Sequence, residues 1–254
     1  MKPMSIEETF QVASAVLGNA EELVDEAGIL MERGRFARAF TLAHLACEEL
    51  AKPPVFFTVA ITITQGEQIP WSKVDKRLRD HMTKIRGGIF VDHMLTPHED
   101  PDADIDILLQ GLRGGAREVD RLKNASLYAN WRDGRMMKPS EVISPELARA
   151  CLQLAQRRLR MAQGFQEGLL QITGGTEAGF RAIVQQPEFL AFMQTAQGIT
   201  GHMNDPELSD AEGETIVRTL LGHPDISQLL SKTSMAMDEL LRAEESQPPD
   251  EARP

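Results

Sequence analysis

Apolar side chains recur at steps of three and four residues along almost every long segment of this 254-residue chain. Between Phe10 and Leu30 they form one continuous stripe, the pattern of a helix that buries one face. Ser5, followed by Glu8 three residues later, predicts a capping box at the start of that helix. Only 5% of the residues are aromatic, whereas a β-sandwich would need more aromatic and β-branched residues. The sequence therefore predicts an all-α fold.

The order of the helices follows from the breaks in this pattern. A second helix from Arg35 to Leu50 carries small residues that suit close antiparallel packing against the first. Pro53-Pro54 predicts a kink or break at Lys52, because proline disfavours helical geometry in the residue before it. The further helices predicted for the first two thirds of the chain cover residues 55–64, 71–86 (ended by Gly87-Gly88), 105–128 (weakened at Gly114-Gly115) and 145–172 (capped by Ser144).

The chain divides at Gly174-Gly175 into a body and a more acidic end. We expect a helical bundle over residues 1–172 and an acidic helical extension over 176–243, followed by a disordered tail over 244–254. The formal net charge is −11, and about twelve acids against four bases lie beyond Gly201. This balance argues against a protein that coats nucleic acid through its overall charge.

Cysteine usage and hydropathy predict a cytoplasmic protein. Cys47 and Cys151 are the only cysteines, and they form no pair or cluster that would hold a zinc ion or a disulfide framework. The N-terminus turns acidic at once and lacks the apolar core of a signal peptide. The longest uncharged run, Pro53 to Gly66, has roughly 14 residues, short of the ~20 that span a bilayer. We therefore expect no membrane partner.

A pair of carboxylates ends the second predicted helix. Glu48 and Lys52 are spaced as an i,i+4 ion pair in the favourable order. Glu49 lies about 100° further round the helix, beside its apolar stripe. The segment by itself is compatible with a surface ion pair plus one solvated acid, and also with a functional carboxylate.

The segment from Lys73 to Arg86 is a local island of positive charge in an acidic chain. Arg77, His81 and Lys84 are predicted to share one helix face, with Asp80 adjoining. An imidazole can transfer protons near neutral pH, and flanking basic groups can stabilise a phosphate. The alternative is a solvated helix in which His81 is a half-buried filler.

A third polar pattern runs from Arg117 to Tyr128. Tyr128 is the only tyrosine, and its spacing from Arg121 and Asn124 places the three residues on one helix face. The alternative for Tyr128 is core packing with a hydrogen-bonded hydroxyl.

No cofactor or metal ion is predicted. Acidic and histidine side chains gather near one loop, but their spacing fixes no coordination geometry; they are Asp92, His93, His98 and Glu99. The chain has no P-loop, no dinucleotide-binding glycine pattern and no nucleophile elbow.

Taken in order, these stretches resemble the AbiV-type abortive-infection family of the HEPN superfamily. The resemblance covers about residues 10–170 and rests on residues 36–39, 46–52, 79–84 and 121–128, with Trp131 and Lys138-Pro139 after them. It implies a HEPN-like helical bundle that often dimerises, in a family associated with bacterial phage defence. Many superfamily relatives are metal-independent ribonucleases whose arginine and histidine pair across a dimer. Such a site would activate a ribose 2′-hydroxyl and give a 2′,3′-cyclic phosphate. The spacing from Arg77 to His81 is shorter than in that signature.

Two hypotheses follow. In the first, the protein is a phage-defence effector acting on RNA, with His81 moving protons and Arg77 and Lys84 holding the phosphate. The residues that would position these groups are Glu49, Lys52, Asp80, Arg121, Asn124 and Tyr128. In the second, the protein is a non-catalytic module that recognises a protein or nucleotide partner.

Under the second hypothesis, five of these side chains form a buried polar network that fixes the helix packing: Glu49, Lys52, Asp80, His81 and Arg121. The partners considered are a second copy of the chain, RNA, and a phage or host protein. A regulatory role is also open, in which the C-terminal helices shield the basic face between Lys73 and Arg86.

Overall fold

The computed structural model describes residues 2–94, 111–132 and 134–187, and its fold is all-α apart from one small hairpin. The elements, in order, are α1 (Ile6–Glu32), α2 (Phe36–Leu50), α3 (Pro53–Thr64), α4 (Trp71–Arg79), α5 (His81–Met94), the π-helical turn η1 (Gly111–Gly115), α7 (Ala116–Leu127), β1 (Asn130–Arg132), β2 (Arg135–Met137), α8 (Pro139–Val142), α9 (Pro145–Thr173) and α10 (Glu177–Val184). The predicted fold class is confirmed.

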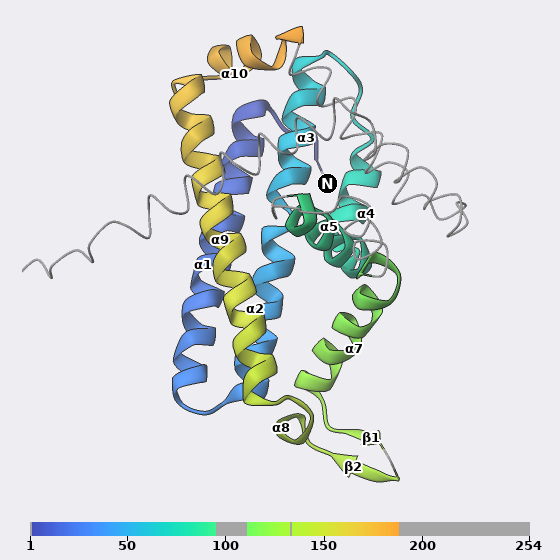
Figure 1. Cartoon of the computed structure of the whole chain (residues 1–254). Helices are drawn as coiled ribbons and strands as arrows, with labels where there is room; N and C mark the ends of the chain where they lie inside the picture. The colour runs from blue at the N-terminus through green and yellow to red at the C-terminus, as the bar shows by residue number, and fades with distance from the viewer. Residues whose placement is uncertain (1, 95–110, 133, 188–254) are drawn as a thin grey trace, which may run out of the picture.

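Three long helices, α1, α2 and α9, stand side by side and enclose the main apolar core (Figure 1). Alanines at the contacts let the helix axes approach closely, and leucines fill the space between them. The buried members of this core are Leu17, Ala20, Val24, Ala27, Ala43, Ala46, Cys47, Leu50, Leu152, Ala155 and Leu159. The predicted capping box of Ser5 and Glu8 is present, and α1 and α2 form the predicted antiparallel hairpin around Gly34, whose φ is +68°.

The break at Lys52 is present, and α3 begins directly at Pro53. The first turn of a helix tolerates proline because its N–H groups have no partner within the helix. α3 packs against α1 and α10, where Phe180 makes edge-to-face contacts with Phe10 and Phe57 at centroid distances of 5.0 and 5.8 Å. This smaller core closes the upper end of the bundle in Figure 1.

The prediction of one helix from residue 71 to residue 86 is wrong. The chain turns at Asp80, whose ψ is 109°, and a second helix, α5, starts at His81. α5 runs on through Gly87-Gly88 to Met94, so the glycines do not end it, and Asp92 and His93 lie in this helix. At Gly88 a side chain would meet the guanidinium of Arg158, 2.6 Å from an added Cβ, so this glycine leaves room for the Arg158 side chain that reaches across from α9.

The hairpin of β1 and β2 was not predicted. Tyr128 leaves helical geometry (φ −120°, ψ 139°) and ends α7. The strands pair antiparallel, with Trp131 opposite Met136, and Gly134 takes a left-handed turn conformation with φ +75°. The hairpin projects from the lower end of the bundle (Figure 1). The weak point expected at Gly114-Gly115 is the π-helical turn η1.

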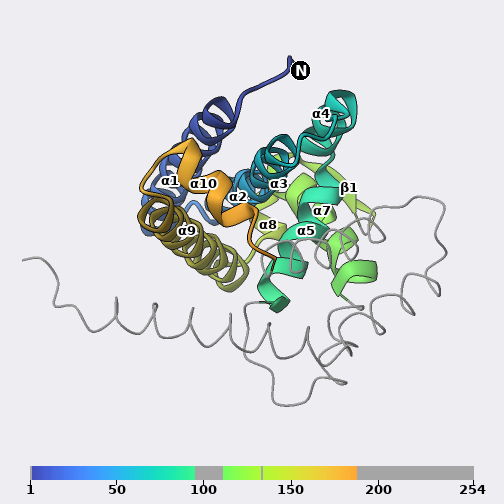
Figure 2. The same cartoon turned by 90° about the horizontal axis from the view of Figure 1, so that it is seen from above.

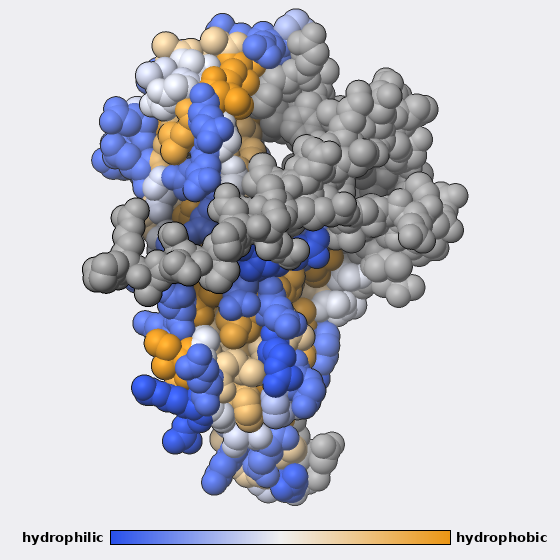
Figure 3. Space-filling view, turned by 60° about the vertical axis from the view of Figure 1, so that its left-hand side comes forward, coloured by the Kyte–Doolittle hydropathy of each residue, from blue (hydrophilic) through white to orange (hydrophobic). Residues whose placement is uncertain are grey.

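The predicted helix from Pro145 is confirmed as α9, with Ser144 as its N-cap and Gly174 in the left-handed conformation after its end. α10 lies at the start of the predicted helical extension. The rest of the extension and the tail over 244–254 lie outside the described residues. The face turned forward in Figure 3 is largely hydrophilic with separate apolar patches, and no described helix is long and apolar enough to cross a membrane.

Seen from above, α2 lies between α1 and α9 on one side and α5 and α7 on the other (Figure 2). α2 therefore has two buried faces, and the second of these carries the candidate site.

Candidate functional site

The second face of α2 is polar although it is buried. Thr41, His44 and Glu48 follow one another at steps of three and four residues, which places them on one side of the helix. Their exposed fractions are 4, 3 and 3%. Buried polar groups need partners, and here α5 and α7 provide them.

Glu48 accepts hydrogen bonds from four side chains on three helices. Its Oε1 accepts from His44 Nε2 at 3.1 Å and from Lys123 Nζ at 2.9 Å. Its Oε2 accepts from His81 Nδ1 at 2.6 Å and from Lys84 Nζ at 2.9 Å. A carboxylate has about four lone-pair positions, so Glu48 is saturated and cannot itself act as a base. These five residues are called the Glu48 cluster below.

The donors keep Glu48 ionised. Burial alone would raise the pKa of its carboxyl, but the hydrogen bonds from the two histidines and two lysines outweigh burial and hold this pKa far below its ordinary value of 4.5. Two buried ammonium groups face one buried carboxylate. At the margin of the cluster, Asp120 Oδ1 lies 3.7 Å from Lys123 Nζ and offsets the second positive charge.

The contacts of His81 fix its tautomer. A 2.6 Å distance from Nδ1 to an ionised carboxylate oxygen requires a proton on Nδ1. Lys123 Nζ lies 3.2 Å from the same Nδ1, but both groups then donate, so this contact reflects the carboxylate that they share. In the neutral ring the other nitrogen, Nε2, is unprotonated. The His81 side chain is 54% exposed, and Nε2 has no hydrogen-bond partner in the described parts of the chain.

Local structure holds His81 and Lys84 against α2. Asp80 caps α5: its Oδ1 accepts from the backbone N–H groups of Met82 and Thr83, and its Oδ2 accepts from the Thr83 hydroxyl. Burial would raise the pKa of the Asp80 carboxyl, but the hydrogen bonds from Thr83 and Met82 lower it overall. The cap fixes the first turn of α5, and one turn separates His81 from Lys84.

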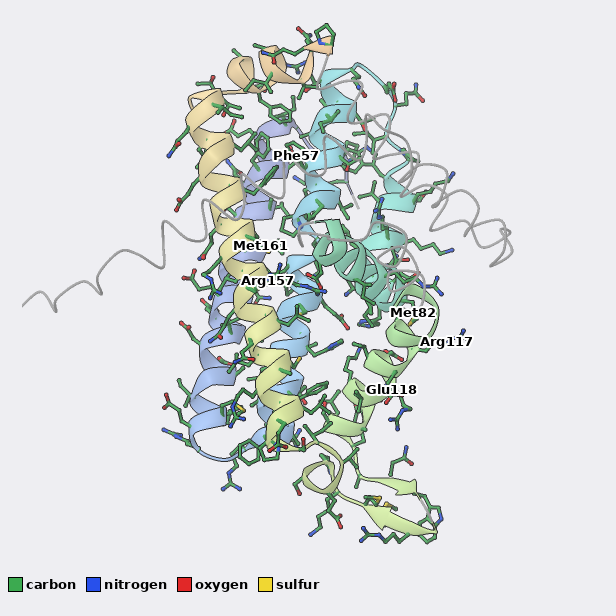
Figure 4. The ribbon with its side chains drawn as sticks, viewed as in Figure 1. Phe57, Met82, Arg117, Glu118, Arg157 and Met161 are labelled. Atoms are coloured by element: carbon green, nitrogen blue, oxygen red, sulfur yellow. The ribbon has the colours of Figure 1, made fainter. Side chains whose placement is uncertain are left out.

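α7 is attached to α2 by a second polar contact. The hydroxyls of Thr41 and Ser126 lie 2.8 Å apart and are both buried, and Ser126 follows Lys123 by one turn. α5 and α7 lie side by side, with Met82 near Arg117 and Glu118 (Figure 4). The Glu48 cluster therefore sits where three helices meet, with His81 at its exposed edge.

Several residues predicted for the site are not members of the Glu48 cluster, among them Glu49, Lys52 and Arg77. The expected Glu48–Lys52 pair is wrong, because Lys52 bonds instead to Glu49, three residues before it. Arg77 is half-buried on α4, and the break at Asp80 means that it does not share one continuous helix face with His81. Burial lowers the pKa of the Arg77 guanidinium, which has no hydrogen bond or ion pair within the described residues.

On α7 the predicted residues point outward. Arg121 is exposed and pairs with Glu118, while Asn124 Nδ2 donates to the carbonyl of Asp120 at 3.0 Å. Tyr128 is 66% exposed, so the alternative of core packing is wrong. The opposite face of α7, with Lys123, turns toward α2.

The sequence did not predict His44 and Lys123 as site residues, and it did not predict the central role of Glu48. The signal that could have found them is a polar residue repeated at helical spacing inside an apolar segment, as at 41, 44 and 48. A complementary pair at 123 and 126 follows on α7. Each of these residues would otherwise be a buried polar group without a partner.

No group of three or more possible metal-ligating residues occurs in the described ranges. The His98 and Glu99 side chains considered in the sequence lie outside them. Cys47 and Cys151 are free thiols, and burial raises the pKa of both.

The fold and the site define this protein as a helical bundle in which a buried charged cluster joins three helices. The comparison with protein families assigns the bundle to the HEPN domains. The HEPN_AbiV family model, described as AbiV, matches residues 8–160. The chain therefore belongs to the AbiV family of HEPN-type abortive-infection proteins, and the match includes every member of the Glu48 cluster. No curated protein and no solved structure gives a match.

Proposed function

We propose that this abortive-infection protein is a metal-independent endoribonuclease in which His81 transfers the proton. One observation carries the proposal: Glu48 holds Nδ1 of His81 in its protonated form at 2.6 Å and leaves Nε2 free at an exposed edge. A carboxylate that orients an imidazole in this way prepares its outer nitrogen to act as a base.

The chemistry is an internal transfer at phosphorus. Nε2 of His81 takes the proton of a ribose 2′-hydroxyl, and the 2′-oxygen attacks the adjacent phosphorus atom. The bond from phosphorus to the 5′-oxygen breaks, which leaves a 2′,3′-cyclic phosphate and, once the 5′-oxygen is protonated, a 5′-hydroxyl. The lysines of the cluster stabilise the carboxylate and so position His81. Arg77, with no charged partner within the described residues, is the group we propose for the phosphate.

In this proposal a second copy of the chain completes the active site. The leaving 5′-oxygen needs an acid, and among the described histidine side chains His44 is buried on Glu48 while His81 is exposed. A symmetric dimer that brings two His81 side chains together would supply both a base and an acid. A phage or host protein stays a predicted partner, as the trigger.

The test is cleavage of labelled RNA by the purified full-length protein in the presence of EDTA. His81→Asn removes the proton-transfer group while its side-chain amide can still donate to Glu48, so we expect loss of cleavage with an unchanged melting temperature. The matched control is Arg79→Ala, which removes an exposed arginine of α4 that pairs with Asp75 and should cleave like the wild type. Cleavage that persists in folded His81→Asn would contradict the assignment.

The non-catalytic module is the second candidate, and the saturation of Glu48 favours it. A fully satisfied buried network can serve to fix helix packing alone, with recognition of a protein or nucleotide elsewhere on the surface. Under this hypothesis the wild-type protein does not cleave RNA, and His81→Asn does not alter the binding of a partner.

A further inference from the structure

The hairpin of β1 and β2, together with the residue that follows α7, exposes three large side chains. Tyr128, Trp131 and Met136 are 66, 66 and 58% exposed. They include the only tyrosine and one of the two tryptophans. Trp131 and Met136 are direct partners across the strands and therefore share one face of the hairpin.

Basic residues follow these aromatic side chains along the chain. The segment 128–138 contains three basic residues and one acidic residue, although the whole chain carries a net charge of −11. Lys138 is exposed. Arg135 is exposed too, but it pairs across the strands with Arg132 and so points to the face opposite Trp131; its ion pair with Glu141 at 3.1 Å lies at the surface, where water screens it. Such a segment can attract a polyanion while the rest of the protein repels it.

We propose that this hairpin is a binding platform for single-stranded RNA, on which bases stack against Trp131 and Tyr128 while the exposed Lys138 contacts the phosphates. Aromatic rings beside basic side chains are the chemistry that recognises unpaired bases, because every base offers a π-face. The inference deepens the proposed function, on which it rests, by naming single-stranded RNA as the substrate class.

The position of the hairpin connects it to the Glu48 cluster. α7 supplies Lys123 to the cluster and ends at Leu127, four residues later, a rise of roughly 6 Å along the helix axis; Tyr128 follows directly. Figure 1 shows the hairpin continuing from the end of α7. The hairpin therefore begins within two helical turns of the α7 residue that contacts the Glu48 cluster.

The exposed area favours RNA over a second copy of the chain as the occupant. A stable dimer buries about 800 Å² on each partner, whereas a large aromatic side chain offers only about 150–250 Å² when fully buried. Three side chains, each partly covered already, do not reach the area that a dimer needs. Stacking of one base needs only one ring face.

The experiment measures binding in the full-length His81→Asn protein, so that the RNA stays intact. The probes are a labelled oligouridylate, a labelled oligoadenylate and the duplex that the two form, followed by fluorescence anisotropy. Trp131→Ala and Tyr128→Ala should each weaken single-strand binding by about 5- to 150-fold, the range for loss of one stacked base, and Tyr128→Phe should bind normally because it keeps the ring. Duplex binding should be weaker from the outset and change little.

Ile172→Ala is the matched control, since Ile172 is 65% exposed and lies on α9 beside α10, at the other end of the bundle. Unchanged single-strand affinity in the Trp131→Ala/Tyr128→Ala double variant would overturn the inference. So would a loss of affinity that only follows dissociation of a dimer by light scattering. If the variants lose binding but the wild type cleaves no RNA, the inference holds and the proposed function fails. If the wild type cleaves RNA and the variants bind it normally, the proposed function holds and the inference fails.

Discussion

The two buried faces of α2 are stabilised by different interactions, apolar packing on one and charged hydrogen bonds on the other. Toward α1 and α9 the helix presents Ala43, Ala46 and Leu50, which pack against apolar side chains and need no particular partner atom. Toward α5 and α7 it presents His44 and Glu48, where one carboxylate accepts from donors 33, 36 and 75 residues away in the sequence. The apolar face tolerates small changes of shape. The polar face depends on all its members at once, because any one left unpaired is a buried polar group.

The largest difference in stability is expected between substitutions of two neighbouring glutamates, Glu48 and Glu49. Glu48→Gln removes the charge that two buried ammonium groups share, and we expect it to lower the free energy of unfolding by about 3–5 kcal/mol. Glu49→Gln removes only the charge that pairs with Lys52, and should cost about 1 kcal/mol or less. Urea unfolding followed by circular dichroism measures both values. Equal costs for the two substitutions would mean that Glu48 does not organise the polar face.

The dependence on pH separates the two faces further. The pKa of Glu48 is depressed in the folded protein, so its contribution to stability is fully present above the ordinary value of 4.5 and is lost as the pH falls below it. The difference between wild type and Glu48→Gln should therefore shrink by about 2 kcal/mol between pH 5 and pH 3.

The control for the pH experiment is Leu159→Ala on the apolar face, which should cost about 3 kcal/mol at both pH values, since no titratable group is removed. Urea unfolding at each pH gives the comparison. A Glu48→Gln difference that stays constant with pH would show that shape rather than charge determines its effect.

The same contrast explains what the sequence could predict. The capping box at Ser5, the break before Pro53 and the long helix after Ser144 depend on neighbours within a few residues, and each was predicted correctly. Glu48 looked like one half of a surface pair with Lys52 because its true partners are contributed by helices far along the chain. His81 was identified from its basic surroundings, whereas Lys123 was passed over for Arg121, which lies on the opposite, exposed face of α7.

The hairpin and the extent of α5 were missed for a related reason. A glycine pair normally ends a helix, but at Gly88 a contact from α9 outweighs the local preference. The aromatic residues of the hairpin gave no alternating pattern long enough to indicate strands. Local periodicity carries no information about tertiary contacts, and elements as short as β1 and β2 are too short to give a periodic pattern.

α5 contributes His81 and Lys84 to the polar face, and its Asp92 pairs with Arg158 of α9. Its two adjacent glycines allow the test with the smallest expected effect. Arg158 on α9 donates from Nε and Nη2 to the Asp92 carboxylate at 2.9 and 2.5 Å, and its guanidinium lies against Gly88. An added Cβ at Gly88 would lie 2.6–2.8 Å from that guanidinium, whereas one at Gly87 would meet nothing within 4 Å. Gly88→Ala must therefore shift the guanidinium of Arg158 and so disturb its pair with Asp92, and even with the helix-propensity gain of alanine it should cost about 1–2 kcal/mol. Gly87→Ala should instead stabilise the protein by up to about 1 kcal/mol. Thermal unfolding of the two variants measures opposite signs if the Arg158–Asp92 pair holds α5 to α9, and stabilisation by both would show that the pair gives way freely.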